Sequence, residues 1–372
     1  MPTGQTQNEN ARGNNFSILR LLFAGLVIVS HSPELIDGNR SREILTRIFG
    51  TLSFGEVGVD GFFLISGYLI AKSYTQSRSF ANFLYKRFLL IFPGYLVNFL
   101  ICLFILAPVL GYAASDVFSA HAVAYNLSSI VRLLPPEEPG PVGPSHPMWL
   151  NGHYLSLNGS MWSISYEFRC YIVAGLLGAL GCYKSGVFRR IFAGCLVVLT
   201  ALNLSGFLVD MPGVIPTIIG DPWGDARLFA LFWMGSIFYV FRDRIPLTHG
   251  GAAIAALGLA LLMFVNRSVA ESAFMLLGGY LVFWFALQVP AFRVSACTDK
   301  TDISYGLYLY AWPLQALMIK MDSAVNPWML CTLTILGAAT AGFVSWKLIE
   351  KPCLRFKGKP SIFAVSAQGV AS

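Results

Sequence analysis

Long runs of sequence without a single charged residue constrain this chain more than any other feature. Five runs of 19 to 28 residues contain no Asp, Glu, Lys or Arg: Phe88–Ser115, Ile191–Val209, Ile245–Asn266, Ser272–Phe292 and Ser323–Trp346. A helix needs about 20 mostly apolar residues to cross the hydrocarbon core of a bilayer. These runs therefore predict helices that span a membrane.

The composition of the whole chain agrees with this prediction. Of the 372 residues, 55% are hydrophobic and only 12% are charged, whereas about 25% of a soluble domain is charged. The seven cysteines form no C-x-x-C pair and lie mostly in apolar segments, which is typical of small buried side chains and not of metal ligands or disulfides. The composition excludes a cytosolic enzyme, a disordered regulator and a secreted disulfide scaffold. It predicts an all-α, polytopic membrane protein.

The distribution of basic residues predicts how the chain is oriented. The ten segments predicted to span the membrane are about Phe16–Ile36, Val57–Tyr74, Leu84–Gly111, Met161–Leu180, Phe188–Val209, Leu228–Phe241, Gly250–Val265, Ser272–Pro290, Ile303–Lys320 and Pro327–Trp346. With the N-terminus inside, 17 Lys and Arg fall in inner segments, 7 fall in outer segments, and Arg20 and Arg169 lie within spans. Cytoplasmic loops carry an excess of Lys and Arg, so this count predicts that both termini are cytoplasmic.

The sequence predicts a single domain with two polar tails. Residues 1–15 form an N-terminal tail, residues 16–352 a transmembrane domain, and residues 353–372 a cytoplasmic C-terminal tail. No cleavable signal peptide is apparent, and the first span is expected to direct insertion. The longest connection, about Tyr112–Ser160, is predicted outside, and its segment Pro135–Pro147 is too rich in proline for a helix. The net charge of +7 comes from scattered Lys and Arg without an aromatic-basic stripe, so no nucleic acid partner is expected.

Two titratable residues share one face of the first span. Arg20 and His31 are eleven residues apart, which is about three helical turns and roughly 16 Å along the axis. Arg20 would lie near the cytoplasmic end and His31 nearer the outside. A charged group in a bilayer is costly unless it faces protein or water. One interpretation is that Arg20 is a fixed cation for an anionic ligand and that His31 is a base. A snorkelling Arg and a His bonded to a neighbouring helix are the other.

Other charges in the spans are candidates for the same site. Asp60 begins the second span, and Glu167 and Arg169 lie in the fourth. A carboxylate on one imidazole nitrogen would orient His31 and raise the basicity of the other nitrogen, and Asp60 and Glu167 are the candidates for that carboxylate. Ser163 shares a helix face with Glu167. Alternatively, these carboxylates cap helix N-termini, which explains Asp60 better than Glu167.

Two further groups of residues have an ordinary structural interpretation. Lys86 and Arg87 open the third span, where they either bind a ligand or anchor the helix at the inner surface. Trp162 and the aromatic segment Tyr305–Trp312 are typical of the belt at a membrane interface.

Together, these residues resemble the integral membrane acyltransferases of the acyltransferase-3 family, along nearly the whole chain. The matching segments are Leu19–His31 (LRLLFAGLVIVSH), Gly58–Ile70 (GVDGFFLISGYLI), Lys86–Tyr95 (KRFLLIFPGY), Asn158–Tyr171 (NGSMWSISYEFRCY), Ser304–Pro313 (SYGLYLYAWP) and Ile349–Pro352 (IEKP). Each motif is short, but all six occur in the family's order on the expected spans. Two positions depart from the family pattern: Leu90 replaces a second Arg in the third-span motif, and Trp312 stands where a His often precedes the proline.

The resemblance implies an O-acyltransferase of a bacterial inner membrane. The donor would be cytosolic acyl-CoA, with acetyl-CoA the expected form, and the acceptor a hydroxyl of an exported or surface glycan or of a lipid-linked sugar. No bound cofactor or metal is implied. Carried over by position, His31 would be the base, with Asp60 and Glu167 in the catalytic group. Arg20, Lys86 and Arg87 would bind acyl-CoA, and Trp162, Ser163, Ser304 and Tyr305 would support the site. The alternatives are a secondary transporter and a polymer exporter with a proton relay.

Overall fold

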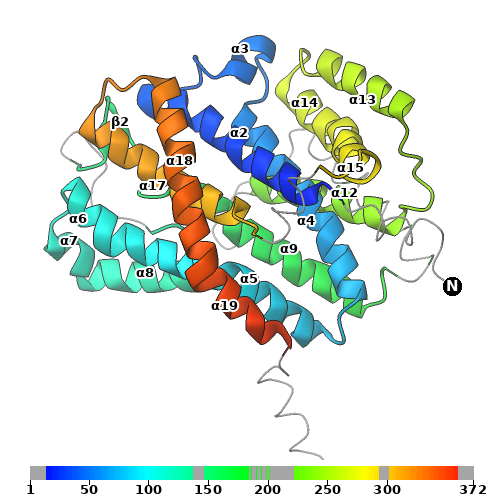
Figure 1. Ribbon diagram of the computed structural model, residues 1–372, viewed down its shortest axis with the longest axis horizontal. Coiled ribbons are helices and arrows are strands. Elements are labelled where there is room, and N and C mark those ends of the chain that lie inside the picture. The colour runs from blue at the N-terminus through cyan, green and yellow to red at the C-terminus, as the bar shows by residue number, and fades with distance from the viewer. Residues whose placement is uncertain are drawn as a thin grey trace, which may run out of the picture.

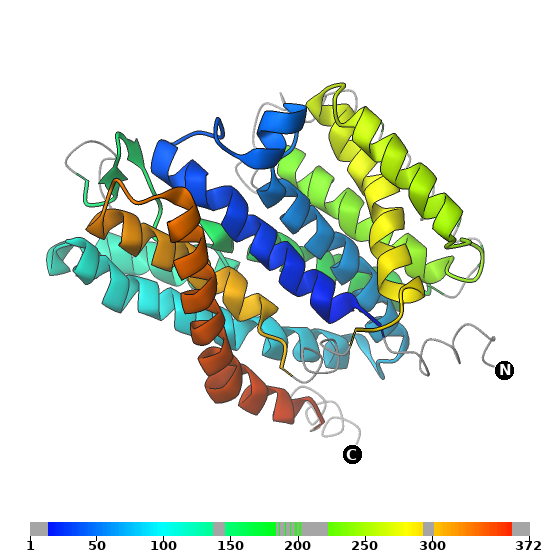
Figure 2. The same ribbon diagram turned by 45° about the horizontal axis from the view of Figure 1, so that its top comes forward.

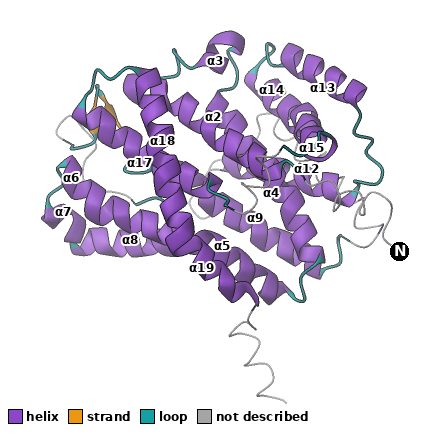
Figure 3. Ribbon diagram, viewed as in Figure 1, coloured by secondary structure: helices purple, strands orange, loops and turns teal. Residues whose placement is uncertain are grey.

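The protein is built almost entirely from helices (Figure 3). The computed structural model describes residues 14–136, 146–183, 222–292 and 301–358, together with a few single positions between 186 and 201. The prediction of an all-α membrane protein is confirmed, because five of the described helices are long and apolar enough to cross a bilayer. Helix coincides with every predicted span except Phe188–Val209, which lies outside the continuously described residues.

The helices follow one another with short connections. In the first half they are α2 (Phe16–Asp37), α3 (Ile44–Phe49), α4 (Phe54–Thr75), α5 (Phe80–Ile101), α6 (Ala107–Leu110), α7 (Ala114–Phe118), α8 (Ala120–Arg132) and α9 (Trp162–Ala179). In the second half they are α12 (Pro222–Val240), α13 (His249–Leu262), α14 (Arg267–Ala273), α15 (Gly279–Gln288), α17 (Ser304–Met321), α18 (Pro327–Ser345) and α19 (Lys351–Leu354). One-turn π segments join three pairs of these helices: Cys102–Leu106, Phe274–Gly278 and Trp346–Glu350. Single 3₁₀ turns lie at Gly159–Met161 and Arg355–Gly358.

The helices α2, α4, α12 and α17 pack together inside the bundle, and α18 lies across its outside against α2 and α17 (Figures 1 and 2). The helices α4 and α12 approach closely because a glycine lies on each side of the contact. A Cβ on Gly67 would lie 1.8 Å from the Phe232 carbonyl oxygen, and one on Gly235 would lie 2.0 Å from the Leu64 carbonyl oxygen. Small residues allow this close packing between membrane helices, where burial from water gives little driving force.

Apolar side chains face outward, as a lipid-exposed surface requires. On α13, Ile254, Leu257 and Leu261 are 74%, 64% and 63% exposed. Their spacing of three and four residues places them on one face of the helix. In water this stripe would be unfavourable, but in a bilayer it faces hydrocarbon at no cost. The exposed apolar stripe supports the membrane location independently of composition.

The long connection between the third and fourth predicted spans begins with helices, which end before its proline segment. After α6 and α7, helix α8 runs back alongside α5, where the Tyr95 hydroxyl donates to the carbonyls of Ser129 (3.1 Å) and Leu134 (2.7 Å). The location of this connection outside the membrane stays a prediction. The central proline segment, 137–145, lies outside the described residues.

A small hairpin follows and covers the end of α2. Strands β1 (Trp149–Leu150) and β2 (His153–Tyr154) pair antiparallel, and the turn residues Asn151 and Gly152 both have positive φ, as tight two-residue hairpins require. His153 Nε2 donates to the Leu35 carbonyl oxygen at 3.0 Å. The hairpin thus holds the last turn of α2, one turn beyond His31.

The predicted orientation has a direct test. Reporter fusions after Ser77, in the turn between α4 and α5, are expected to report a cytoplasmic location, and fusions after Ala324, between α17 and α18, an external one. The physical reason is the excess of Lys and Arg in the inner segments. A cytoplasmic signal at Ala324 would contradict the assigned orientation of the helices.

Candidate active site

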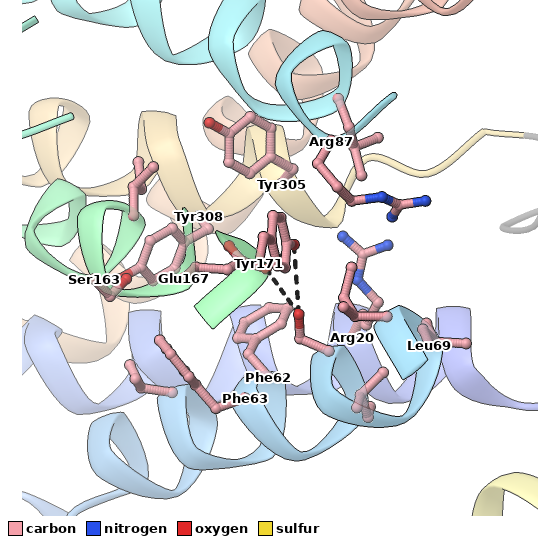
Figure 4. A pocket seen from close by; sticks show the side chains of 16 residues that line it. Arg20, Phe62, Phe63, Leu69, Arg87, Ser163, Glu167, Tyr171, Tyr305 and Tyr308 are labelled. Atoms are coloured by element: carbon pink, nitrogen blue, oxygen red, sulfur yellow. Dashed lines mark hydrogen bonds between the residues drawn. The ribbon is translucent and has the colours of Figure 1, made fainter. Parts of the chain in front are cut away.

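A cavity lies inside the bundle between α2, α4, α5, α9 and α17. In Figure 4, Arg20 and Arg87 face each other at one end, and Ser163 and Tyr308 lie at the other. The walls between are mainly apolar, with Phe62, Phe63 and Leu69 among them. A mainly apolar lining with a few polar groups is typical of small-molecule sites.

The two arginines at the first end have different partners. Arg20 forms an ion pair with Asp302, which also accepts hydrogen bonds from the backbone N (3.2 Å) and Oγ (2.6 Å) of Ser304 at the start of α17. Arg87 donates to Ser73 Oγ at 2.8 Å and lies 5.8 Å from the centroid of the Phe83 ring. Arg20 thus already has a counter-ion, whereas no carboxylate contacts Arg87 among the described residues. By the predicted orientation this end is cytoplasmic.

Glu167 lies in the wall of the same cavity. The Tyr171 hydroxyl donates to its Oε1 at 2.5 Å and the Ser66 hydroxyl at 3.2 Å. Both Glu167 and Ser163 line the cavity, so the prediction that they share a face of α9 is confirmed. The carboxylate faces the arginine end, and none of its hydrogen bonds involves His31.

The second end of the cavity is closed by a tyrosine. The Tyr308 hydroxyl donates to the Ser160 carbonyl oxygen at 2.6 Å and lies 2.8 Å from Ser163 Oγ. The ring of Phe62 packs edge-on against it, with 6.0 Å between the centroids. Trp312 lies one turn further along α17, about 6 Å along the axis.

His31 lies just beyond this end. Its ring packs edge-on against Trp312 with centroids 5.0 Å apart, and its Nδ1 is 3.1 Å from Glu34 Oε2. Arg20 contacts Asp302, just before the start of α17, and His31 contacts Trp312 within α17. Both side chains therefore face the same neighbouring segment. The prediction that these two residues share one face of the first span is confirmed. The depth of His31 in the membrane stays a prediction.

The carboxylate that contacts His31 is not one of the two expected. Asp60 is fully buried and accepts a hydrogen bond from Arg227 Nη2 at 2.5 Å, and Arg227 Nε lies 3.7 Å from Glu271. Asp60 also does not cap its helix, because Ser53 and Glu56 form the capping box of α4. The pairing of Asp60 or Glu167 with His31 was therefore wrong, since each is bound to other side chains.

The remaining candidates are only partly at the cavity. Tyr305 lines it and donates to the Ile91 carbonyl oxygen at 3.0 Å, and Leu90 lines it where the family pattern has an arginine. Lys86, Trp162 and Ser304 do not line it.

Arg169, the second arginine within a span, also lies apart from the cavity. Its guanidinium lies 4.9 Å from the centroid of the Tyr166 ring. In the part of the chain that the structure describes, no three His, Cys, Asp or Glu side chains cluster as metal ligands would.

The sequence analysis missed four residues that the structure brings to these sites: Glu34, Asp302, Tyr171 and Arg227. Glu34 carried a usable signal, because it follows His31 by three residues and such residues are neighbours on a helix. Tyr171 follows Glu167 by four residues, a spacing that also makes neighbours on a helix. Asp302 and Arg227 contact residues 282 and 167 positions away, and no local pattern reveals such contacts.

Comparison with known proteins agrees with this arrangement. Residues 14–346 match the family described as "Acyltransferase domain". The chain belongs to the acyltransferase-3 family. The family match covers every helix that lines the cavity and includes both Arg20 and His31. The chain is therefore an acyltransferase.

Two curated relatives cover nearly the full length. An O-acetyl transferase of Shigella phage Sf6 is 28% identical over 354 residues, covering 91% of this chain and 96% of the relative. Nodulation protein 10 of Rhizobium leguminosarum bv. viciae is 27% identical over 377 residues, covering 94% and 96%. No solved structure matches the chain. The relatives share the whole domain and not only a motif.

Proposed function

We propose that this acyltransferase moves an acetyl group from cytosolic acetyl-CoA to a hydroxyl of an exported or surface glycan, or of a lipid-linked sugar. The observation that carries the proposal is the cavity that begins at Arg20 and Arg87 and ends at Tyr308, one helical turn from the Trp312 ring against which His31 packs. The name of the phage relative, O-acetyl transferase, supports acetyl as the group transferred. A bacterial inner membrane is the proposed location.

The arginine end of the cavity is suited to the nucleotide part of the donor. CoA carries several phosphate charges, and arginine binds phosphate through charge-assisted, often bidentate hydrogen bonds. Arg87 presents its guanidinium there, and Arg20 would exchange Asp302 for a phosphate. Lys86 does not line the cavity, so its proposed part is limited to attraction at the entrance.

The apolar walls are suited to the arm that carries the acyl group. Roughly 16 Å separates Arg20 from His31 along α2, a distance that the pantetheine arm can span. Because Tyr308 lies between the cavity and Trp312, the proposal includes a movement of Tyr308 or Trp312 that opens a path from the cavity to His31 for the thioester.

The proposed chemistry is proton removal by His31. The imidazole takes the proton of the acceptor hydroxyl as its oxygen bonds to the thioester carbonyl carbon. Collapse of the tetrahedral intermediate breaks the carbon–sulfur bond, and the CoA thiolate leaves and takes up a proton. The products are the acetyl ester of the acceptor and free CoA. The family membership favours this function over a secondary transporter or a polymer exporter, because the chain is an acyltransferase.

A purified preparation tests the proposal. The protein in detergent, given acetyl-CoA and a surface glycan extract, is expected to release CoA thiol and to add the mass of acetyl groups to the glycan. A strain that lacks the gene is expected to lose those acetyl groups from its glycans. CoA release without any glycan dependence, or unchanged glycans in the deletion strain, would contradict the proposed acceptor.

A further inference from the structure

Side-chain contacts link His31 to the outer ends of three other segments. From His31 the contacts pass in order through Glu34, Arg40, Glu56, Arg267, Glu271, Arg227 and Asp60. Basic and acidic groups alternate along this series, so Glu34, Glu56 and Glu271 each lie between two basic side chains, and Asp60 ends the series at Arg227. The part nearest His31 bears directly on how its imidazole is held.

The contact with Glu34 fixes which nitrogen of His31 carries the proton. Glu34 Oε2 is 3.1 Å from His31 Nδ1, and the other oxygen, Oε1, accepts from Arg40 Nε at 3.0 Å. An ionised carboxylate only accepts hydrogen bonds, and the arginine keeps Glu34 ionised. Nδ1 must therefore be the donor, which leaves the lone pair on Nε2, the nitrogen that a general base needs.

Arg40 ties this pair to a rigid part of the fold. Its Nη1 lies 3.1 Å from Glu56 Oε1. Glu56 is held in turn by the capping box of α4, where its Oε2 accepts from the backbone N of Ser53 at 2.8 Å and from the Ser53 hydroxyl at 3.0 Å. Glu34 thus has a fixed position relative to α4 as well as α2.

The backbone places Arg40 where it can make these contacts. Gly38 ends α2 with φ of 67° and turns the chain back toward the helix. A Cβ at this position would lie 2.7 Å from the ring of His153, so only glycine fits. From α17, Gln315 donates to Ser32 Oγ at 2.9 Å and to the Ile28 carbonyl oxygen at 3.3 Å, on either side of His31 in the sequence. The last turns of α2 are therefore held from both sides of His31.

We propose that Glu34 is the positioning residue for His31 and that Arg40 anchors Glu34 through its contact with Glu56. The inference rests on the proposed function, in which His31 is the base. Glu34 holds Nδ1–H so that Nε2 faces the acceptor hydroxyl. When His31 takes the hydroxyl proton, the carboxylate faces the resulting imidazolium. Glu34 itself neither gains nor loses a proton.

The test compares Glu34→Gln with a matched carboxylate variant, Asp37→Asn, in the purified protein with acetyl-CoA. Glu34→Gln is expected to lower kcat for glycan acetylation at least about tenfold, part of the about 10²–10⁴-fold that a positioned base contributes, with KM for acetyl-CoA unchanged. Asp37 lies in the same last turn of α2 but pairs with Arg42 at the surface, and its variant is expected to keep normal kinetics. Arg40→Ala is expected to lower kcat less than Glu34→Gln, and Arg40→Lys to restore most of that loss.

A second acceptor distinguishes positioning from a merely structural role. Hydroxylamine is a strong neutral nucleophile that attacks thioesters without a base, so its acetylation by Glu34→Gln is expected to stay within about twofold of the unmodified protein. Equal losses with glycan and hydroxylamine would show that the substitution damages the fold and would overturn the proposal. Normal glycan kinetics in Glu34→Gln, with His31→Ala inactive, would overturn it while leaving the proposed function intact. An active His31→Ala would instead refute the assigned base, and with it the inference.

Discussion

Replacing His31 with alanine is expected to lower kcat for glycan acetylation by about 10²–10⁴-fold, the range that a positioned general base contributes. The acceptor hydroxyl is a weak nucleophile until its proton is removed, and no other imidazole contacts the end of the cavity among the described residues. The binding of acetyl-CoA is expected to change little, because Arg20 and Arg87 lie at the opposite end. Radiolabel transfer from acetyl-CoA to glycan, together with donor binding by calorimetry, measures both effects.

His153→Ala is the matched control for this experiment. His153 lies at the same end of α2. Its ring nitrogens contact the carbonyl oxygens of Leu35 and Asn151 and not the His31 side chain. Its variant is expected to retain catalysis and to elute normally from a sizing column. Retained transfer in His31→Ala, with the protein correctly inserted, would mean that another group removes the proton.

Replacing Arg87 with alanine is expected to raise KM for acetyl-CoA about tenfold to hundredfold while kcat changes little. A hydrogen bond to a charged group contributes about 1.5–3 kcal/mol, and each 1.4 kcal/mol corresponds to about a tenfold change in affinity. A higher KM with unchanged kcat is the mark of binding lost equally from ground and transition states. Initial rates at varied donor and fixed acceptor concentrations measure the effect.

Two further variants separate donor binding from a general effect of charge at the inner face. Arg242 is predicted to lie there as well; its guanidinium is 4.5 Å from the centroid of the Tyr239 ring and does not line the cavity, so Arg242→Ala is expected to leave KM unchanged. Lys86→Ala is expected to have a smaller effect than Arg87→Ala, because Lys86 does not line the cavity. If the combined Lys86→Ala/Arg87→Ala protein is inserted correctly and binds acetyl-CoA normally, the donor site lies elsewhere.

The sequence by itself determined that this is a membrane protein and that Arg20 and His31 lie on one face of its first span. Uncharged runs of about 20 residues leave no alternative to membrane helices, because isolated charges and unpaired backbone groups are costly in hydrocarbon. The spacing of Arg20 and His31 placed both on one helix face, since helical periodicity is local and regular. Six short motifs in order then identified the family.

Only the tertiary structure decided which groups meet. Asp60 and Glu167 were both candidates for contacting His31 in the sequence, yet Asp60 is bound by Arg227 of α12, and Glu167 lies among Tyr171, Ser66 and the cavity arginines. A buried charge contacts whichever opposite charge or hydrogen-bond donor the packing brings within reach, and that depends on how close α4, α9 and α12 lie. Glycines such as Gly67 and Gly235 set that spacing between α4 and α12. The partners of a membrane-embedded charge are therefore decided by helix packing, while the presence of the charge is written in the sequence.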